Sequence, residues 1–318
     1  MALKMREFKF IQYVFLVTSS IAVYMVSGGV DFSDSINIIK WMIDREIQGY
    51  DYLSFLDFYA LFGEDSNYGF IVQNLIILLL INILIVNIGI SSFLIYFYLS
   101  VFSCLLGLIT KELFFLLGFL VLLITQFYDG KKLLFLILGY GLGSYILLIT
   151  KPLLGLIYIV SFLYVILANK LRITSKFIYY GILIISCILL TKTNYYNNME
   201  TIYFGQSLSG DFNKHLSGHS IIATSGRFIA NIASPVYNID SISGLDSYQL
   251  YVSIAAVCVI LRLIWICNSK NKNCQAIDGN IRYVIVLNII ISVLIPFVQT
   301  RYLLPGLIIL FLKPKNNL

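Results

Sequence analysis

The sequence predicts an all-α protein: a polytopic integral-membrane helix bundle with about ten transmembrane segments. Its 318 residues are 59% hydrophobic and only 12% charged, and the mean hydropathy is +0.88. Soluble globular domains are roughly 45–50% apolar and about 25% charged, so this composition excludes an ordinary soluble enzyme. The apolar residues also fall in long runs, and a helix needs about 20 of them to cross a bilayer.

Ten apolar runs are candidate membrane-spanning helices, and together they make residues 1–318 a single transmembrane domain. Several runs are short for isolated lipid-facing helices but suit helices packed inside a bundle. The first run follows Lys4, Arg6 and Lys9, as in a signal peptide, but no small-residue cleavage site follows, so we interpret it as a span. The predicted spans are 10–27, 71–90, 91–109, 112–127, 133–150, 153–168, 177–191, 249–267, 283–299 and 302–312.

The distribution of charge orients these spans, because Lys and Arg near span ends stay on the cytoplasmic side. With the N-terminus inside, the inner loops carry thirteen basic and three acidic residues. The outer segments carry eight basic and thirteen acidic residues. Both termini are therefore predicted to be cytoplasmic, and the net charge of +6 is read as a topology signal.

Two long outer loops, 28–70 and 192–248, hold most of the polar residues, whereas the inner loops are short. In the first loop, apolar residues between Ile36 and Ile43 stand among the charged residues Lys40, Asp44, Arg45 and Glu46. This mixture predicts an amphipathic helix lying in the interface. The second is rich in Ser, Gly, Asn and Tyr, which suits carbohydrate and equally suits any exposed loop. Transporters more often bury polar residues at the midplane, so this distribution favours chemistry or binding at the outer boundary.

Three residues of these loops are candidate proton acceptors. Asp31 and Asp34 follow Gly28-Gly29 at the mouth of the first span, where a carboxylate near lipid has a raised pKa and can serve as a base. The alternative is a plain N-cap, with Ser33 or Asp34 starting the helix. His215, in HLSGHS, is a candidate for proton transfer, although surface histidines without a catalytic role are commoner.

Four cations are candidate ligands of a shared anion. Lys111 and Lys151 each stand in Ile-Thr-Lys between apolar runs, and Arg301 stands in TRYLLPG; all three are predicted in tight outer turns. Arg227 opens the apolar run RFIANIA. Snorkelling or a local ion pair would explain any one of these cations. Because a cation near lipid is costly, several in tight outer turns favour one ligand, and a lipid-linked diphosphate fits that depth.

No metal, cofactor or nucleic acid is expected as a partner. The short inner loops build no basic face for nucleic acid. The chain has no Walker A or dinucleotide-binding glycine motif, so ATP and NAD are not implied. Its five cysteines form no disulfide framework or CxxC motif, and two histidines are too few for a zinc site.

These features resemble the EpsG-like and Wzy-type O-antigen polymerases, which are similar to type C glycosyltransferases. The shared features are an Asp soon after the first span, in GGVDFSDS, and an acidic and aromatic run entering the second, EDSNYGFIVQNL. Basic outer turns and a late Arg-Tyr-x-x-Pro, RYLLP at Arg301 to Pro305, complete the pattern. The chain departs from it where the family's middle spans carry arginine: Lys111 and Lys151 would act there as point charges.

The resemblance implies a metal-independent glycosyltransferase that polymerises undecaprenyl-diphosphate-linked oligosaccharide repeat units. The product would be a surface polysaccharide, either O-antigen or capsule and exopolysaccharide, made at the periplasmic face of a bacterial inner membrane. Its partners would be the lipid-linked oligosaccharide, membrane lipid and a chain-length regulator protein. The cations would neutralise the departing diphosphate, while Asp31, Asp34 or a histidine such as His215 deprotonates the acceptor hydroxyl.

Two alternatives stay open. One is a type C glycosyltransferase that adds a single sugar from a polyprenyl-phosphate donor. The other is a transporter or a flippase for a lipid-linked oligosaccharide.

Overall fold

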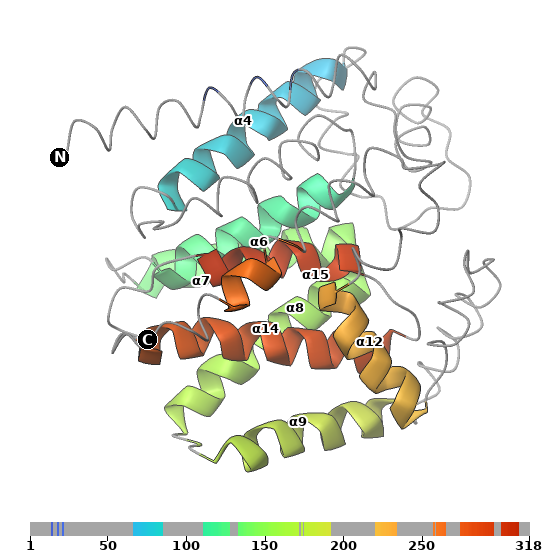
Figure 1. Ribbon diagram of the computed structural model, residues 1–318. Coiled ribbons are helices and arrows are strands. Elements are labelled where there is room, and N and C mark those ends of the chain that lie inside the picture. The colour runs from blue at the N-terminus through green and yellow to red at the C-terminus, as the bar shows by residue number, and fades with distance from the viewer. Residues whose placement is uncertain are drawn as a thin grey trace, which may run out of the picture. The chain divides into compact units, whose positions relative to one another are not determined.

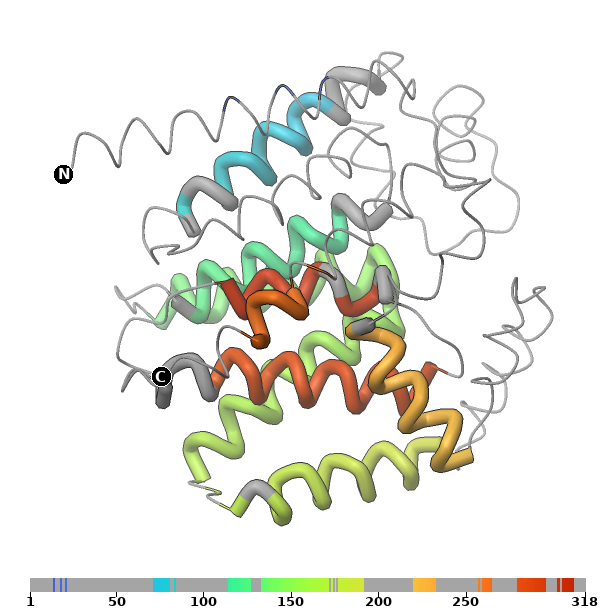
Figure 2. Tube along the Cα trace, in the orientation of Figure 1, coloured from blue at the N-terminus to red at the C-terminus, as the bar shows by residue number. Residues whose placement is uncertain are grey.

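In the computed structural model nearly all of the described residues are helical, and no strand occurs among them (Figures 1 and 2). The helices are α4 (Ser66–Leu84), α6 (Lys111–Phe127), α7 (Leu133–Thr150), α8 (Pro152–Lys170), α9 (Lys176–Leu190), α12 (Ile221–Ala233), α14 (Cys274–Leu294) and α15 (Thr300–Leu307), with the 3₁₀ helix η4 (Ile308–Phe311). The described residues are 14, 18, 21, 66–84, 111–127, 133–171, 173, 175–191, 220–233, 257, 259–264, 274–295 and 300–311.

The all-α prediction is confirmed for these residues, and four predicted spans match helices to within two residues at each end. The spans 112–127, 133–150, 153–168 and 177–191 correspond to α6, α7, α8 and α9. Each is a nearly uninterrupted apolar run, which hydropathy locates well. Within the described part of the chain, two helices, α7 and α8, are long and apolar enough to cross a membrane, and the ten-span arrangement stays a prediction.

Three helices differ from their predicted limits. α14 begins at Cys274, nine residues before the predicted span, and α4 begins at Ser66, five residues before its span. α12 lies inside the segment 192–248, which was predicted as an outer loop. The first turns of α14 and much of α12 are polar, so hydropathy missed them although they are helical. The predicted interfacial helix of 28–70 lies outside the described residues.

The chain divides into two compact units, and the first contains α4, α6, α7 and the start of α8. Within it, α6 packs against both α4 and α7. The α6–α7 contact uses small residues: a Cβ on Gly143 would lie 2.8 Å from Leu122 Cγ and 3.0 Å from the Gly118 carbonyl oxygen. A Cβ on Gly139 would likewise lie too close to the side chain of Thr125. Rising α7 numbers thus meet falling α6 numbers, so the two helices are antiparallel.

The second unit contains the rest of α8 with α9, α12, α14 and α15. α14 is its central helix: α9, α12 and α15 all pack on it, and none of its described side chains from Gly279 to Leu294 is exposed (Figure 1). α9, in contrast, presents Ile185, Leu189 and other large apolar side chains outward.

Candidate functional site

Lys111 and Lys151 lie at the same end of the α6–α7 hairpin. Lys111 is the first residue of α6, seven residues before Gly118. Lys151 follows the last residue of α7, eight residues after Gly143. Because Gly118 and Gly143 contact each other and an α-helix rises about 1.5 Å per residue, both lysines lie roughly 10–12 Å beyond that contact, in the same direction. Two lysines forty residues apart in the sequence thus share one end of the hairpin.

Lys151 occupies a junction of a single residue between α7 and α8. Its N–H donates to the Leu147 carbonyl at 3.1 Å and its carbonyl accepts from Gly155 N–H at 2.7 Å, so it caps both helices. The junction is tight, since a Cβ on Gly155 would lie 2.6 Å from the Leu147 carbonyl oxygen. Pro152 begins α8, where its missing N–H costs nothing. The Lys151 side chain is half-buried and lies at the C-terminal end of α7, where helical carbonyls favour a cation.

Arg227 is fully buried in the second unit, on the face of α12 that meets α14. Its Nε–H donates to the main-chain carbonyl of Ser292 at 2.9 Å, and Nη2 donates to Thr224 Oγ1 at 3.1 Å. In an α-helix, the Ser292 carbonyl would accept from the N–H of residue 296. That residue is Pro296, which has no N–H. The guanidinium therefore binds a carbonyl that the sequence leaves without a helical donor.

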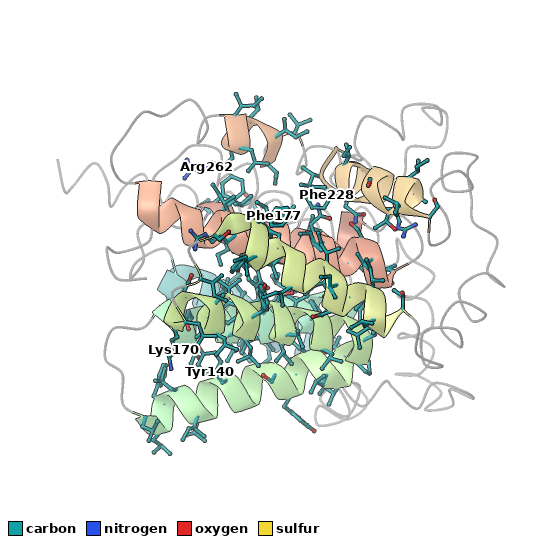
Figure 3. All side chains as sticks on the ribbon, turned by 90° about the horizontal axis from the view of Figure 1, so that it is seen from below. Tyr140, Lys170, Phe177, Phe228 and Arg262 are labelled. Atoms are coloured by element: carbon teal, nitrogen blue, oxygen red, sulfur yellow. The ribbon has the colours of Figure 1, made fainter. Side chains whose placement is uncertain are left out.

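A buried amide and hydroxyl network extends from Arg227 along the α12–α14 contact. Asn231 Nδ2 donates to Ser292 Oγ at 3.1 Å and to Asn288 Oδ1 at 3.3 Å, and Ser292 Oγ donates to Asn288 Oδ1 at 3.1 Å. Asn288 Nδ2 donates to the main-chain carbonyl of Phe228 at 2.8 Å. Phe228 is labelled in Figure 3. Asn231 and Asn288 are 0% exposed. Because these buried side chains are hydrogen-bonded to one another across the contact, the network fixes the register of α12 against α14.

The amphipathic pattern of α12 is inverted with respect to a helix in water. Its buried positions include Arg227 and Asn231, whereas Ile221 and Ile222 are each 83% exposed and Ile229 is 61% exposed. In water, this arrangement would bury the cation and expose the isoleucines, at a cost for both. Next to hydrocarbon, exposed isoleucines cost nothing and the polar face gains its partners inside the protein.

Arg301 is the second residue of α15, which packs on both α12 and α14. Arg227 binds a carbonyl two residues from the end of α14, and α15 begins six residues after that end. Six residues span at most about 20 Å, so the backbone of Arg301 lies toward the same end of α14 as Arg227. The second unit thus has a pair of arginines at this end, as the first has a pair of lysines at one end of its hairpin.

A second buried arginine, Arg262, lies toward the other end of α14. Its Nε–H donates to the Leu310 carbonyl at 3.1 Å, and Asn280 Nδ2 donates to the Ile309 carbonyl at 2.9 Å. Leu310 stands four residues before Pro314, as Ser292 stands four residues before Pro296. In both cases the proline four residues later is the sequence signal that marks the carbonyl as lacking a helical donor.

The other sequence-predicted site residues, Asp31, Asp34 and His215, lie outside the described part of the chain. The side chains of Lys111 and Arg301 also belong to the undescribed set, so their positions are given by the backbone alone. Over the described ranges, no group of three or more His, Cys, Asp or Glu side chains comes together to bind a metal.

Comparisons with protein-family models, with curated proteins and with solved structures found no match to this chain. The candidate residues fall into two groups, one in each compact unit: the lysine pair at one end of the α6–α7 hairpin, and the buried amide network with Arg227 and Arg301 toward one end of α14.

Proposed function

We propose that the protein is an integral-membrane polymerase that joins undecaprenyl-diphosphate-linked oligosaccharide repeat units at the outer face of a bacterial inner membrane. The observation that carries this proposal is the pairing of Lys111 with Lys151 at one end of the α6–α7 hairpin. A diphosphate needs more than one positive charge, and a tight helical hairpin supplies two at one level. Arg301 adds a cation in the other unit, where the buried Arg227 binds the Ser292 carbonyl.

The proposed reaction transfers the donor chain to a hydroxyl of the acceptor sugar. The acceptor sugar's hydroxyl oxygen attacks the anomeric carbon of the donor chain, and a new C–O bond forms. The bond between that carbon and the donor's diphosphate breaks, and the diphosphate leaves with the electron pair. The hydroxyl proton passes to a base, for which Asp31, Asp34 and His215 are the candidates, and the cations stabilise the negative charge of the leaving group.

Two diphosphates take part in this reaction, because the acceptor unit keeps its own lipid diphosphate while the donor's departs. The lysine pair belongs to one compact unit and Arg301 to the other. We assign the lysine pair to one of these diphosphate groups. Lysines bind as point charges, whereas Arg301 has the fork geometry for two oxygens.

Membrane insertion is part of the proposal and is supported by which side chains face outward. The inverted α12 exposes isoleucines and buries a guanidinium, and α7 exposes Leu134, Leu138 and Leu142 along its length. α7 and α8 are each long enough to cross the hydrocarbon core. We assign both termini to the cytoplasm from the basic residues of the predicted inner loops.

The test is deletion of the gene in its host, followed by gel analysis of the surface polysaccharide. A polymerase deletion leaves acceptors that carry one repeat unit, and the wild-type gene restores the ladder. Arg301→Ala should insert normally and yield single units only. Normal chain length in that variant would remove Arg301 from the site, and a normal ladder in the deletion strain would refute the function.

One observation favours the transporter or flippase alternative. α15 contains Pro305 and continues as the 3₁₀ helix η4, whose carbonyls are bound by side chains from other segments. Broken helices of this kind form substrate sites in transporters. A flippase deletion would abolish all repeat units on the outer surface, whereas a type C glycosyltransferase deletion would remove one sugar without shortening a ladder.

A further inference from the structure

The hydroxyl of Tyr158 contacts the backbone of α15 at two points. It donates to the Tyr302 carbonyl at 2.7 Å and accepts from the Gly306 N–H at 3.0 Å. An α-helix pairs these two backbone groups with each other, because they stand four residues apart. Tyr158, on α8, is 0% exposed, so both hydrogen bonds form away from solvent. One side-chain hydroxyl therefore ties together both ends of a single helical turn.

This turn lies where α15 is weakest. Pro305 stands inside the helix and supplies no N–H, so the carbonyl of Arg301 lacks its helical donor. A proline inside a helix commonly bends it. The Tyr158 hydroxyl binds the carbonyl of the next residue, Tyr302, and so supports the helix one step from the position that the proline disrupts.

Gly306 is the residue that lets Tyr158 reach the backbone. A Cβ at this position would lie 2.4 Å from Leu287 Cδ2 and 3.3 Å from the Tyr158 hydroxyl oxygen. α15 therefore packs close to α14 and to Tyr158 on the side where Gly306 has no side chain. The motif RYLLPG thus combines a cation, a proline and a glycine within six residues, and Tyr158 contacts two of those residues from a different helix.

We propose that Tyr158 is a positioning residue for Arg301: it holds the Tyr302–Gly306 turn and so fixes the turn that carries the guanidinium. The inference rests on the proposed function only for the consequence of moving Arg301. The physical part, that the hydroxyl sets the place of the first turn of α15, does not depend on it. Tyr158 contacts no substrate in this mechanism and acts through Arg301 alone.

The first test is a double-mutant cycle on polymerisation. The substrate is the lipid-linked repeat unit extracted from the deletion strain, and the enzyme is the full chain in lipid nanodiscs. Tyr158→Phe should lower kcat about tenfold at unchanged protein yield, because small misplacements of a charge-stabilising group are costly. In an Arg301→Lys background, the same Tyr158→Phe change should have an effect of less than about twofold, since the group it positions is already altered. Equal effects in both backgrounds would overturn the proposal.

The matched control is Tyr179→Phe. Tyr179 is also buried in the second unit, and its hydroxyl has no hydrogen-bond partner within the described structure. The same loss of one oxygen atom should leave kcat within about twofold of wild type. If Tyr179→Phe lowers kcat as much as Tyr158→Phe, the effect is general destabilisation and the positioning role is refuted.

A second test does not need the enzyme activity, so it separates failure of the inference from failure of the proposed function. Arg301→Cys is made in a chain whose five natural cysteines are replaced, and the rate of its labelling by a membrane-impermeant methanethiosulfonate is measured. Adding Tyr158→Phe should change that rate severalfold, whereas adding Tyr179→Phe should not. An unchanged rate with Tyr158→Phe refutes the positioning role even if the polymerase activity is proven.

Discussion

Arg227 donates its Nε–H to the main-chain carbonyl of Ser292 at 2.9 Å, and that carbonyl stands four residues before Pro296. The pairing explains how a fully buried guanidinium and an interrupted helix coexist. The proline removes the helical donor, and the arginine of a neighbouring helix provides another. Arg262 and Leu310 repeat the arrangement before Pro314.

Arg227→Ala is expected to lower the free energy of unfolding by about 1–3 kcal/mol or more, because it leaves the Ser292 carbonyl buried without its donor. Adding Pro296→Ala restores an N–H four residues after Ser292 and should recover about 1 kcal/mol of that loss. Thermal unfolding of the purified protein in detergent measures both changes. If the double variant is less stable than Arg227→Ala alone, the carbonyl account of Arg227 is wrong.

Asn231→Asp should also destabilise the protein, although it changes the side chain by only one atom group. Asn231 Nδ2 donates to Ser292 Oγ and Asn288 Oδ1, and a carboxylate would place an acceptor against both at a fully buried position. The expected loss is about 2 kcal/mol or more. Asn169→Asp is the control: Asn169 is exposed and its Oδ1 accepts from Arg282 Nη1, so its unfolding temperature should not fall.

Gly155→Ala tests the tight junction between α7 and α8. The new methyl group would lie 2.6 Å from the Leu147 carbonyl oxygen, and a backbone atom cannot rotate away. We expect a loss of about 1–3 kcal/mol, measured by thermal unfolding. Gly141→Ala in α7 has no atom within 4 Å of its Cβ, and the better helix propensity of alanine should make it neutral or more stable by up to about 1 kcal/mol. Equal outcomes for the two variants would contradict the predicted difference.

The lysine pair can be tested by cross-linking without any assay of function. In the cysteine-replaced chain, Lys111→Cys combined with Lys151→Cys should react with a short bis-maleimide to give an internally linked product of altered gel mobility. Lys111→Cys combined with Leu133→Cys should not react, because Leu133 begins α7 about 25 Å from its other end. Cross-linking of the second pair alone would show that the two helices are not antiparallel.

The sequence predicted α6, α7, α8 and α9 well because each is an apolar run bounded by polar residues. It missed α12 as a helix because Thr224, Arg227 and Asn231 lower the hydropathy of that segment, although these side chains turn inward in the folded chain. The first turns of α14 were missed for the same reason, since Asp278, Asn280 and Arg282 fall within them. Hydropathy reports the preference of a residue for lipid, not the partner that a neighbouring helix supplies.

The candidate site shows a similar division between what a single sequence can and cannot tell. The two Ile-Thr-Lys motifs were visible as a pair, and the hairpin brings them to one end. The contact between Tyr158 and RYLLPG was not visible, because nothing in the residues 158 and 302–306 indicates that their helices pack together. Contacts that depend on which helices are neighbours require the three-dimensional arrangement.

The connection between α7 and α8 consists of Lys151 alone, so it cannot absorb a change in length. Because each helical residue turns the chain by about 100°, a single insertion or deletion there would rotate every side chain of α8 against the helix before it. An insertion or deletion at this point should therefore prevent folding, even where many substitutions are tolerated. Epitopes, protease sites or fluorescent domains intended to report on this protein belong elsewhere in the chain.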